Sequence, residues 1–149
     1  MVASSTLISD TVIFVRNLLR TDITDPIVAT RGTLSKFVMT SYPRRPVEYP
    51  LITVKLTDMI AGPLGMQTNA QEVHSELEIR VWARNVQERD ELTQQIYTDL
   101  RTKQTTATTG SYANSLNDFA VTSMTDVDGE GEQAIMSKVI MIKYMFIST

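Results

Sequence analysis

The sequence predicts an α+β fold, with a mostly antiparallel sheet of about five strands and two helices packed on one face. Two segments place apolar residues at helical spacing, and two others alternate apolar and polar residues as half-buried strands do. The chain has 149 residues, of which 42% are hydrophobic, and its sequence contains no internal repeat or domain linker. We therefore expect a single domain over residues 1–149, with a protruding hairpin loop near 61–71 and a polar loop near 104–117.

The first helix is expected from Thr6 to Arg20. Apolar residues recur there at steps of three and four, which places them along one side of a helix. They are Ile8, Val12, Val15 and Leu19, and Leu7, Phe14 and Leu18 widen the stripe. Ser4 or Ser5 is suited to cap the start of this helix. Asp25-Pro26 closes the region, because a residue before proline is pushed out of helical geometry.

A strand is predicted next, from Leu34 to Tyr42, because this run is rich in β-branched and aromatic residues. The connector that follows, residues 42–50, holds three of the five prolines, so it must be extended. One interpretation is an ordinary loop between strands. The other is a pre-ordered contact arm, because tyrosine and arginine often carry the energy of protein interfaces. The residues concerned are Tyr42, Arg44, Arg45 and Tyr49.

Two alternating segments, residues 52–60 and 72–84, predict a long hairpin. In the second segment one set of residues should face the core, namely Val73, Leu77, Ile79, Val81 and Ala83. The other set should face away, namely Glu72, His74, Glu76, Glu78, Arg80, Trp82 and Arg84. Leu64 and Met66 lie near the turn, where a solvated loop needs no apolar residue, so we expect a neighbour to cover them.

The second helix is expected to start at Asn85, because Asn85-Val86-Gln87-Glu88 is close to a capping box. Its core face should carry Leu92, Ile96 and Leu100, with Val86, Tyr97 and the stem of Arg89 alongside. The helix is expected to end over residues 101–103, where cations suit the negative end of its dipole. Residues 105–117 are rich in Thr, Ser, Asn and Gly, which predicts a polar loop.

Two strands are predicted at the end of the chain, from Phe119 to Thr125 and from Ile135 to Ile147, with an acidic turn between them. The last strand is apolar on both parities from Val139 to Ile142. This pattern is typical of a central strand covered on two sides.

The composition argues against several classes of enzyme. The chain contains no cysteine and one histidine, His74, which excludes thiol nucleophiles, sulfur-ligated metals and multi-histidine sites within one copy. The sequence also lacks a nucleophile elbow and a phosphate-binding loop. We therefore expect a protein that is not an enzyme, with no catalytic residue and no cofactor.

Two acidic clusters are the nearest approach to a metal site. Glu72, His74, Glu76 and Glu78 alternate along one strand, where neighbours of the same parity stand about 6.6–7 Å apart. That spacing keeps adjacent carboxylates from sharing an ion unless they converge, which favours a solvated or interfacial strand face. The segment from Asp126 to Glu132 resembles the start of a calcium loop but lacks the flanking helices and full ligand set, which favours an acidic turn. No metal site is predicted.

Charge and hydropathy limit the classes of partner that the sequence allows. The net charge of -3, without a dense stripe of Lys or Arg, argues against sequence-specific binding of nucleic acid. No segment approaches the roughly 18 apolar residues of a membrane span, and the start of the chain lacks the pattern of a signal peptide. We expect a soluble protein made inside the cell.

Trp82 lies on the polar side of its strand, beside Arg80 and Arg84. A tryptophan in this position is either covered by another part of the same chain or used in a contact between chains. The sequence leaves both interpretations open.

Two stretches carry a resemblance to a known family. The first reads Tyr-Pro, five residues, then Tyr-Pro-Leu-Ile-Thr-Val over residues 42–54, and the second is Ile79-Arg80-Val81-Trp82-Ala83-Arg84 running into a helix that opens Glu88-Arg89-Asp90-Glu91. With the N-terminal helix, this pattern resembles the tail-terminator and tail-completion proteins of long-tailed, siphovirus-like phages and related viruses. The likeness covers most of the chain in element order. Residues 105–117 depart from the family pattern, being longer and more polar.

The resemblance implies a structural virion protein of the tail or neck, made in the host cytoplasm. It implies a homo-oligomeric ring, expected to be hexameric, that terminates the tail tube and joins the tail to the head. The implied partners are further copies of the chain, the tail-tube protein and a neck or head-completion protein, with no membrane. Genome DNA would pass through the lumen without sequence-specific binding, for which an acidic or weakly charged wall is favourable.

The subunit or tail-tube interface is expected to contain Tyr42, Arg44, Arg45, Tyr49, Leu64, Met66, Trp82 and Arg84. Two other classes of function compete with a tail terminator. The nearer class is another head-tail connector, such as a head-completion or stopper protein, or a tail-tube subunit. The more distant class is a non-viral cytoplasmic adaptor or binding domain, which need not form a ring.

Overall fold

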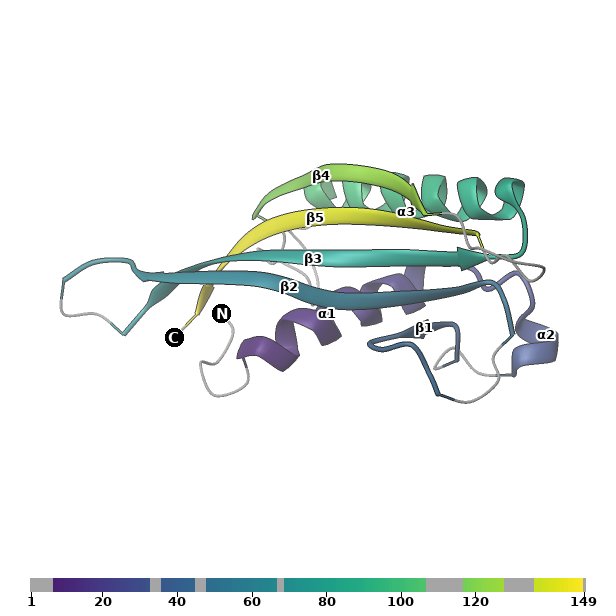
Figure 1. Ribbon diagram of the computed structural model, residues 1–149. Helices are drawn as coiled ribbons and strands as arrows, with labels where there is room; N and C mark the ends of the chain where they lie inside the picture. Colours follow the sequence, from purple (N-terminus) through teal and green to yellow (C-terminus); the bar gives the residue numbers. More distant parts are fainter. Residues whose placement is uncertain are drawn as a thin grey trace.

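The computed structural model describes residues 7–32, 36–44, 48–66, 69–106, 117–127 and 136–148 (Figure 1). Within these residues the chain forms three helices and five strands. The helices are α1 (Leu7–Asp22), α2 (Val28–Arg31) and α3 (Val86–Thr106). The strands are β1 (Val38–Met39), β2 (Leu51–Pro63), β3 (Gln71–Ala83), β4 (Asn117–Val127) and β5 (Met136–Ser148).

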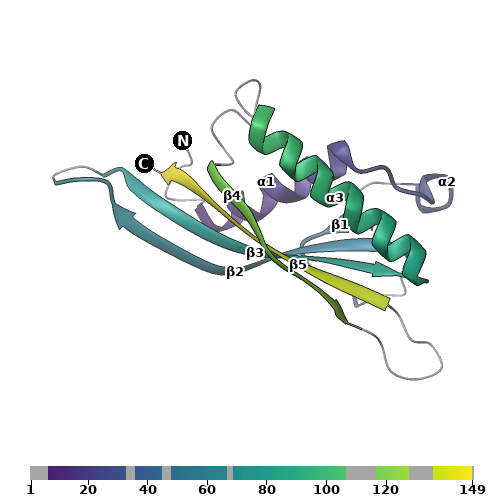
Figure 2. The ribbon, with the colours of Figure 1, turned by 90° about the horizontal axis from the view of Figure 1, so that it is seen from above.

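The strands form one sheet in the order β1-β2-β3-β5-β4. β1 runs parallel to β2, and the other neighbouring pairs are antiparallel. The two long helices, α1 and α3, lie on the same side of the sheet (Figure 2). The predicted α+β fold, with a mostly antiparallel sheet and two helices on one face, is therefore confirmed.

The hydrophobic core lies between the two long helices and the sheet face that they cover. Its buried residues include Val15, Leu18 and Leu19 of α1, Leu92, Ile96 and Leu100 of α3, and Leu77, Ile79, Ile140 and Ile142 of the central strands. Hydrogen bonds from the side chains of Arg20 and Tyr144 connect α1 to this layer. Arg20 Nη2 donates to the carbonyl of Val38 at 2.7 Å, and the Tyr144 hydroxyl donates to the carbonyl of Thr11 at 3.1 Å.

The long hairpin predicted from alternation is present as β2 and β3, paired from Leu51 and Trp82 to Pro63 and Gln71. The β3 residues expected in the core are fully buried. A register shift between Leu56 and Asp58 makes Thr57 an extra residue in β2, which reverses the alternation beyond it. Ile60 therefore stands opposite His74, on the sheet face that α1 and α3 leave uncovered. We call this the open face.

Several expectations about the first half of the chain need correction. Ile8 is exposed rather than buried, because it sits on the first turn of α1, before the residues that pack on the sheet. Within the described residues 36–42, the strand expected over 34–42 is limited to β1, since the chain leaves β2 after Met39 and Tyr42 crosses to the open face. The short helix α2 was not predicted. The caps proposed at Ser4 and Ser5 lie outside the described residues.

The second half also differs in detail. The Asn85 cap is confirmed, because the backbone N–H of Glu88 donates to Asn85 Oδ1 at 2.9 Å. Val86 is exposed on the first turn, and α3 continues to Thr106 rather than fading by residue 103. β4 continues to Val127, so Asp126 belongs to the strand rather than to a turn. The polar loop expected near 104–117 falls largely on residues 107–116, outside the described residues.

β5 lies between β3 and β4, but the expected cover on two sides is wrong for the single chain. Both long helices lie on one side, and no described element covers the other (Figure 2). Val139, Met141 and Met145 are therefore only partly buried, in register with Arg80, Glu78 and His74 of β3. None of the described helices is long and apolar enough to cross a membrane.

Candidate functional site

Three of the residues predicted at an interface come together on the open face. Tyr42 follows β1, Tyr49 precedes β2, and Trp82 lies near the end of β3. The Tyr42 and Trp82 rings have centroids 4.9 Å apart and planes inclined at 56°. The hydroxyl groups of Tyr42 and Tyr49 are hydrogen bonded to each other. We call Tyr42, Tyr49, Trp82 and Arg80 the aromatic patch.

Arg80 belongs to this patch because it lies two residues before Trp82 on the same face of β3. Its guanidinium carbon stands 4.7 Å from the centroid of the Trp82 ring, which is a cation–π contact. On the other side, Trp82 Nε1 donates to Thr53 Oγ1 at 3.2 Å. The patch is thus built by the β2–β3 register, which brings Thr53 opposite Arg80, together with the connector that returns Tyr42 to the sheet.

The contacts of Trp82 bear on the two interpretations of this residue. Its ring is covered in part within the chain, by Tyr42 and Arg80, and it is partly buried. Tyr42 itself remains 44% exposed. Burial and the hydrogen bond with Tyr42 raise the pKa of Tyr49 to about 12, so that hydroxyl stays protonated at neutral pH. The patch therefore offers a neutral aromatic surface edged by a cation.

The remaining predicted residues of this end differ in environment. Arg44 is exposed, two residues from Tyr42, whereas Arg45 lies outside the described residues. Arg84 forms an ion pair with Glu88, with Nη2 and Oε2 2.5 Å apart. The hydrogen bond and charge of Glu88 raise the pKa of Arg84. Burial works against ionisation of Glu88, but Arg84 outweighs it and lowers the pKa of Glu88. Arg84 thus contacts the start of α3, and Arg44 is an exposed cation two residues from Tyr42 of the patch.

The other two predicted interface residues lie at the far end of the hairpin. Leu64 is 46% exposed and Met66 is 95% exposed, and Ile60 of β2 adds a third apolar side chain that is 64% exposed. The turn is closed by the backbone N–H of Leu64, which donates to the carbonyl of Ala70 at 3.1 Å. We call Ile60, Leu64 and Met66 the hairpin tip. Figure 1 shows this end of β2 and β3 reaching past α1.

The structure does not bring the hairpin tip and the aromatic patch together. They lie at opposite ends of β2, which has 13 residues and, at about 3.3 Å per residue, spans about 40 Å. Seven of the eight predicted interface residues are described, and they divide between the two ends of the hairpin. Leu64 and Met66 lie at the hairpin tip, and the other five lie at the opposite end, namely Tyr42, Arg44, Tyr49, Trp82 and Arg84. Sequence reasoning missed Arg80 and Ile60. The shared parity of Arg80 and Trp82 was a usable signal for the first, whereas only the bulge at Thr57 reveals the second.

The acidic row of β3 faces the open side. His74 Nε2 and Glu72 Oε1 are 2.8 Å apart. The register sets Glu78 opposite Lys55 and Glu76 opposite Lys143, so charges of opposite sign are cross-strand neighbours. In the part of the chain that the structure describes, no group of three His, Asp or Glu side chains is placed to hold a metal ion.

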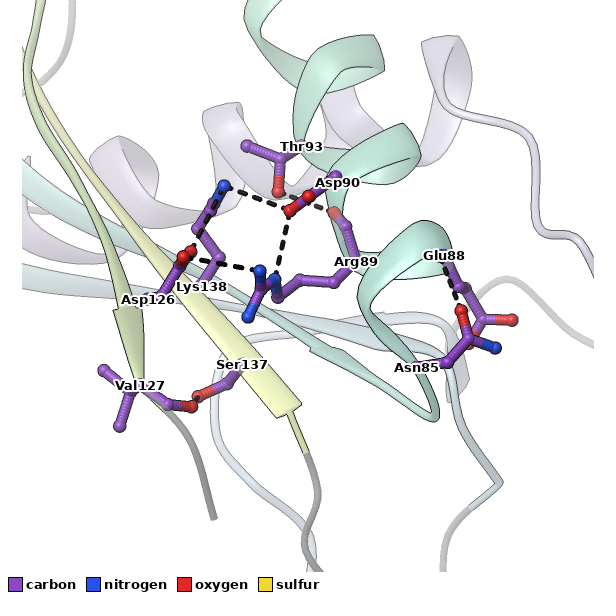
Figure 3. A network of polar contacts seen from close by, with 9 residues as sticks. All are labelled: Asn85, Glu88, Arg89, Asp90, Thr93, Asp126, Val127, Ser137 and Lys138. Carbon is purple, nitrogen blue, oxygen red and sulfur yellow. Dashed lines mark hydrogen bonds and ion pairs between the residues drawn. The ribbon is translucent and has the colours of Figure 1, made fainter.

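A network of charges joins α3 to the edge of the sheet (Figure 3). Asp126 of β4 pairs with Arg89 at 3.3 Å and with Lys138 at 3.2 Å. Asp90 pairs with the same two cations, at 3.1 Å in both cases, and hydrogen bonds with Lys138 and Arg89 lower the pKa of Asp90. Asp126, the first residue of the suggested calcium loop, is thus engaged in pairing β4 with α3 and β5. The rest of that segment lies largely outside the described residues.

No protein-family model matches this sequence, and no curated protein matches it significantly. The candidate site consequently depends on the geometry of the chain itself.

Proposed function

We propose that this protein is a structural component of a virion that assembles into a homo-oligomeric ring, expected to be hexameric. The ring would terminate the tail tube and join the tail to the head. The observation that supports the ring is the separation of two exposed contact surfaces, the hairpin tip and the aromatic patch, at opposite ends of one continuous hairpin. Surfaces of this kind suit head-to-tail contacts, which close into rings when the rotation between copies allows it.

The position in a tail rests on the resemblance to tail-terminator and tail-completion proteins. The elements that carry this resemblance are the N-terminal helix, the strand entered after Tyr49-Pro50, and the strand that runs into the second long helix, which correspond to α1, β2, β3 and α3. The partners in this proposal are the tail-tube protein and a neck or head-completion protein. Genome DNA would pass through the lumen, and the net charge of -3 would help to keep it from binding there.

The first experiment measures the assembly state of the full chain by light scattering and negative-stain electron microscopy over a range of concentrations. Six copies of 16.7 kDa give about 100 kDa, and we expect a closed ring of about that mass. A chain that stays monomeric at high concentration, alone and with its tail-tube partner, would contradict the proposal. It would favour the non-viral adaptor instead.

The neighbouring genes separate a viral role from a non-viral one. Capsid, portal and tail genes beside the gene for this protein would support a head-tail role, and metabolic or regulatory neighbours would contradict it.

A tail-tube experiment separates the viral alternatives from one another. Adding the purified protein to tail tubes of the same virus should cap one end and stop their growth. A ring that binds the portal side and leaves tube length unchanged would favour a head-completion or stopper protein.

A further inference from the structure

The hairpin tip and the aromatic patch are chemically complementary. The tip presents a methionine and two branched aliphatic side chains, and Met66 is almost fully exposed at 95%. The patch presents the rings of Tyr42 and Trp82, inclined to each other, with Tyr42 accessible at their edge. A flexible thioether packs favourably against aromatic rings, and the exposed apolar surface of both would be removed from water.

Charge points to the same pairing. Residues 56–79, which include the whole hairpin tip, contain four acidic residues and no Lys or Arg. Glu72 lies nearest the tip, and Asp58 and Glu76 stand opposite each other further along the hairpin, with Glu76 also opposite Lys143 of β5. The patch end carries the cations Arg44 and Arg80, with Glu48 as an exposed acid next to Tyr49. One end of the hairpin is therefore acidic and the other basic, which favours contact between unlike ends and opposes contact between like ends.

The tip cannot reach the patch of its own chain. The two are held about 40 Å apart by a continuous antiparallel pairing from Leu51 and Trp82 to Pro63 and Gln71. A second copy of the chain can supply the missing partner, since every copy carries both surfaces. Such a contact is heterologous, and it leaves a free tip at one end and a free patch at the other until the ring closes.

We infer that the hairpin tip of one subunit docks on the aromatic patch of the next, with Met66 against the Tyr42 and Trp82 rings. This inference rests on the proposed ring and names the two surfaces that build it. The acidic flank of the hairpin lies beside Arg44 and Arg80 of the neighbour. Each subunit thus donates one tip and accepts another.

Thiol cross-linking tests the pairing cleanly, because the chain has no cysteine of its own. Two single variants are made, Met66→Cys at the tip and Arg44→Cys beside the patch, both at exposed positions. They are mixed in equal amounts, allowed to assemble and treated with a short bismaleimide. A covalent dimer is expected from the mixture and from neither variant alone. Met124→Cys replaces Met66→Cys in the control mixture, since Met124 is also exposed, at 50%, but lies on β4.

The outcomes are distinct. Cross-linked dimer from Met66→Cys alone indicates contact between two tips and overturns the inference. A ring that forms normally in the mixture without cross-linking overturns the inference and leaves the proposed ring intact. A chain that remains monomeric in all samples contradicts both. Equal cross-linking in the Met124→Cys mixture also overturns it, because the contact would then be nonspecific.

A substitution without cross-linker gives an independent readout. Met66→Ser removes the anchor from an exposed position, so the circular dichroism and thermal unfolding of the subunit should not change. Subunit association should weaken by about ten-fold or more, as for the loss of a buried anchor at an interface. Met124→Ser should leave association unchanged. Equal association of the Met66→Ser variant and the unaltered protein would overturn the inference.

Discussion

At the scale of single residues, Arg31 is a buried side chain with several bonds to its surroundings. It is 5% exposed, and its Nε lies 2.7 Å from Asp25 Oδ2. The same guanidinium donates to the carbonyls of Lys36, Glu48 and Pro50. It also lies over the ring of Phe37, at 5.2 Å from the centroid. One arginine thereby joins α2 to the backbone just before β1 and to the second end of the connector, around Tyr49.

Replacing Arg31 should destabilise the fold strongly. We expect Arg31→Met to lower the free energy of unfolding by about 3–5 kcal/mol, because it leaves the buried Asp25 carboxylate without its cation. Arg31→Lys should recover little, since a single ammonium group cannot serve four acceptors spread around a planar guanidinium. Urea unfolding measures both changes.

Two further variants sharpen this measurement. Arg101→Met removes an exposed arginine and should change the unfolding free energy by less than about 0.5 kcal/mol. Combining Asp25→Asn with Arg31→Met removes the stranded charge, so the double variant should be more stable than Arg31→Met alone. A double variant no more stable than Arg31→Met would show that the carboxylate is not the source of the loss.

Burial of a charged residue such as Arg31 is not predictable from its sequence surroundings. Arginine is almost always exposed, and the four residues of α2 are too few to show a helical period. The same limit applies to the aromatic patch. Tyr42 and Trp82 are far apart in the chain, and only the shortness of β1 brings the first onto the face of the second. The residue types indicated that these side chains could form an interface. That Tyr42 and Trp82 lie side by side could be seen only from the folded structure.

At the scale of elements, the start of α3 is fixed by local chemistry. Asn85 Oδ1 accepts the N–H of Glu88, and the Glu88 side chain accepts from the N–H of Arg84 at 3.2 Å. The Asn85→Ala substitution should therefore lower the free energy of unfolding by about 1 kcal/mol, the usual worth of such a cap. Gln95→Ala, at an exposed position of the same helix, should have no destabilising effect. Thermal and urea unfolding of the two variants will compare them, and equal stability would show that the Asn85 cap contributes nothing.

A pair of carboxyl groups joins α1 to α3. Burial, followed by the negative charge of Asp22, raises the pKa of Asp99 to about 7, while Lys103 acts in the opposite direction. Lys103 Nζ lies 3.6 Å from Asp22 Oδ2. Because an unfolded Asp has a pKa of about 3.9, the unfolded chain releases this proton at a lower pH than the folded chain does. The stability that protonated Asp99 gives is complete below about pH 4 and is lost as the pH rises towards 7.

The Asp99→Asn variant tests this linkage. Between pH 4.5 and 7.5 the unaltered protein should lose about 1–2 kcal/mol more stability than the variant, allowing for solvent screening of a partly exposed pair. Urea unfolding at several pH values gives the two curves. Parallel curves would contradict the linkage. Lys103→Met, with Asp99 retained, should lose more stability over the same pH range than the unaltered protein, because the substitution removes the cation near both carboxylates.

The elements with strong periodicity are the ones that sequence reasoning found. β3 alternates over its whole length, and α1 and α3 show apolar residues at steps of three and four, so their burial followed directly. Effects that depend on a neighbour did not follow. The bulge at Thr57 turned Ile60 to the open face, and the placement of α1 and α3 on one side left half of β5 uncovered. Periodicity reports which residues are apolar, but not what lies against them.

At the scale of the whole molecule, the sheet is covered on one face and extended at one end. The described helices lie on one side only, while the hairpin tip reaches beyond them (Figures 1 and 2). β5 keeps apolar residues on the open face as well as in the core, namely Val139, Met141 and Met145. These side chains are only partly buried, and accessible apolar surface is common at interaction sites of soluble proteins. The uncovered face and the extended hairpin tip therefore support the proposed assembly.

Oxidation of methionine offers a measurement of assembly that alters no residue in advance. Met66 is 95% exposed and Met124 is 50% exposed, so in dilute, monomeric protein peroxide should oxidise Met66 first. In the proposed ring the neighbour would cover the tip, so the oxidation rate of Met66 should fall by about ten-fold or more on assembly, while that of Met124 changes little. Peptide mass spectrometry follows both residues in one sample.

Oxidising Met66 before assembly is the converse experiment. Oxidation turns the apolar thioether of Met66 into a polar sulfoxide, which packs poorly against aromatic rings. Protein oxidised at Met66 as a monomer should therefore assemble less well, and reduction by methionine sulfoxide reductases should restore assembly. Protection of Met124 instead of Met66 would place the subunit contact at β4, on the edge of the sheet. Equal oxidation of Met66 in monomer and ring would show that the hairpin tip remains in water after assembly.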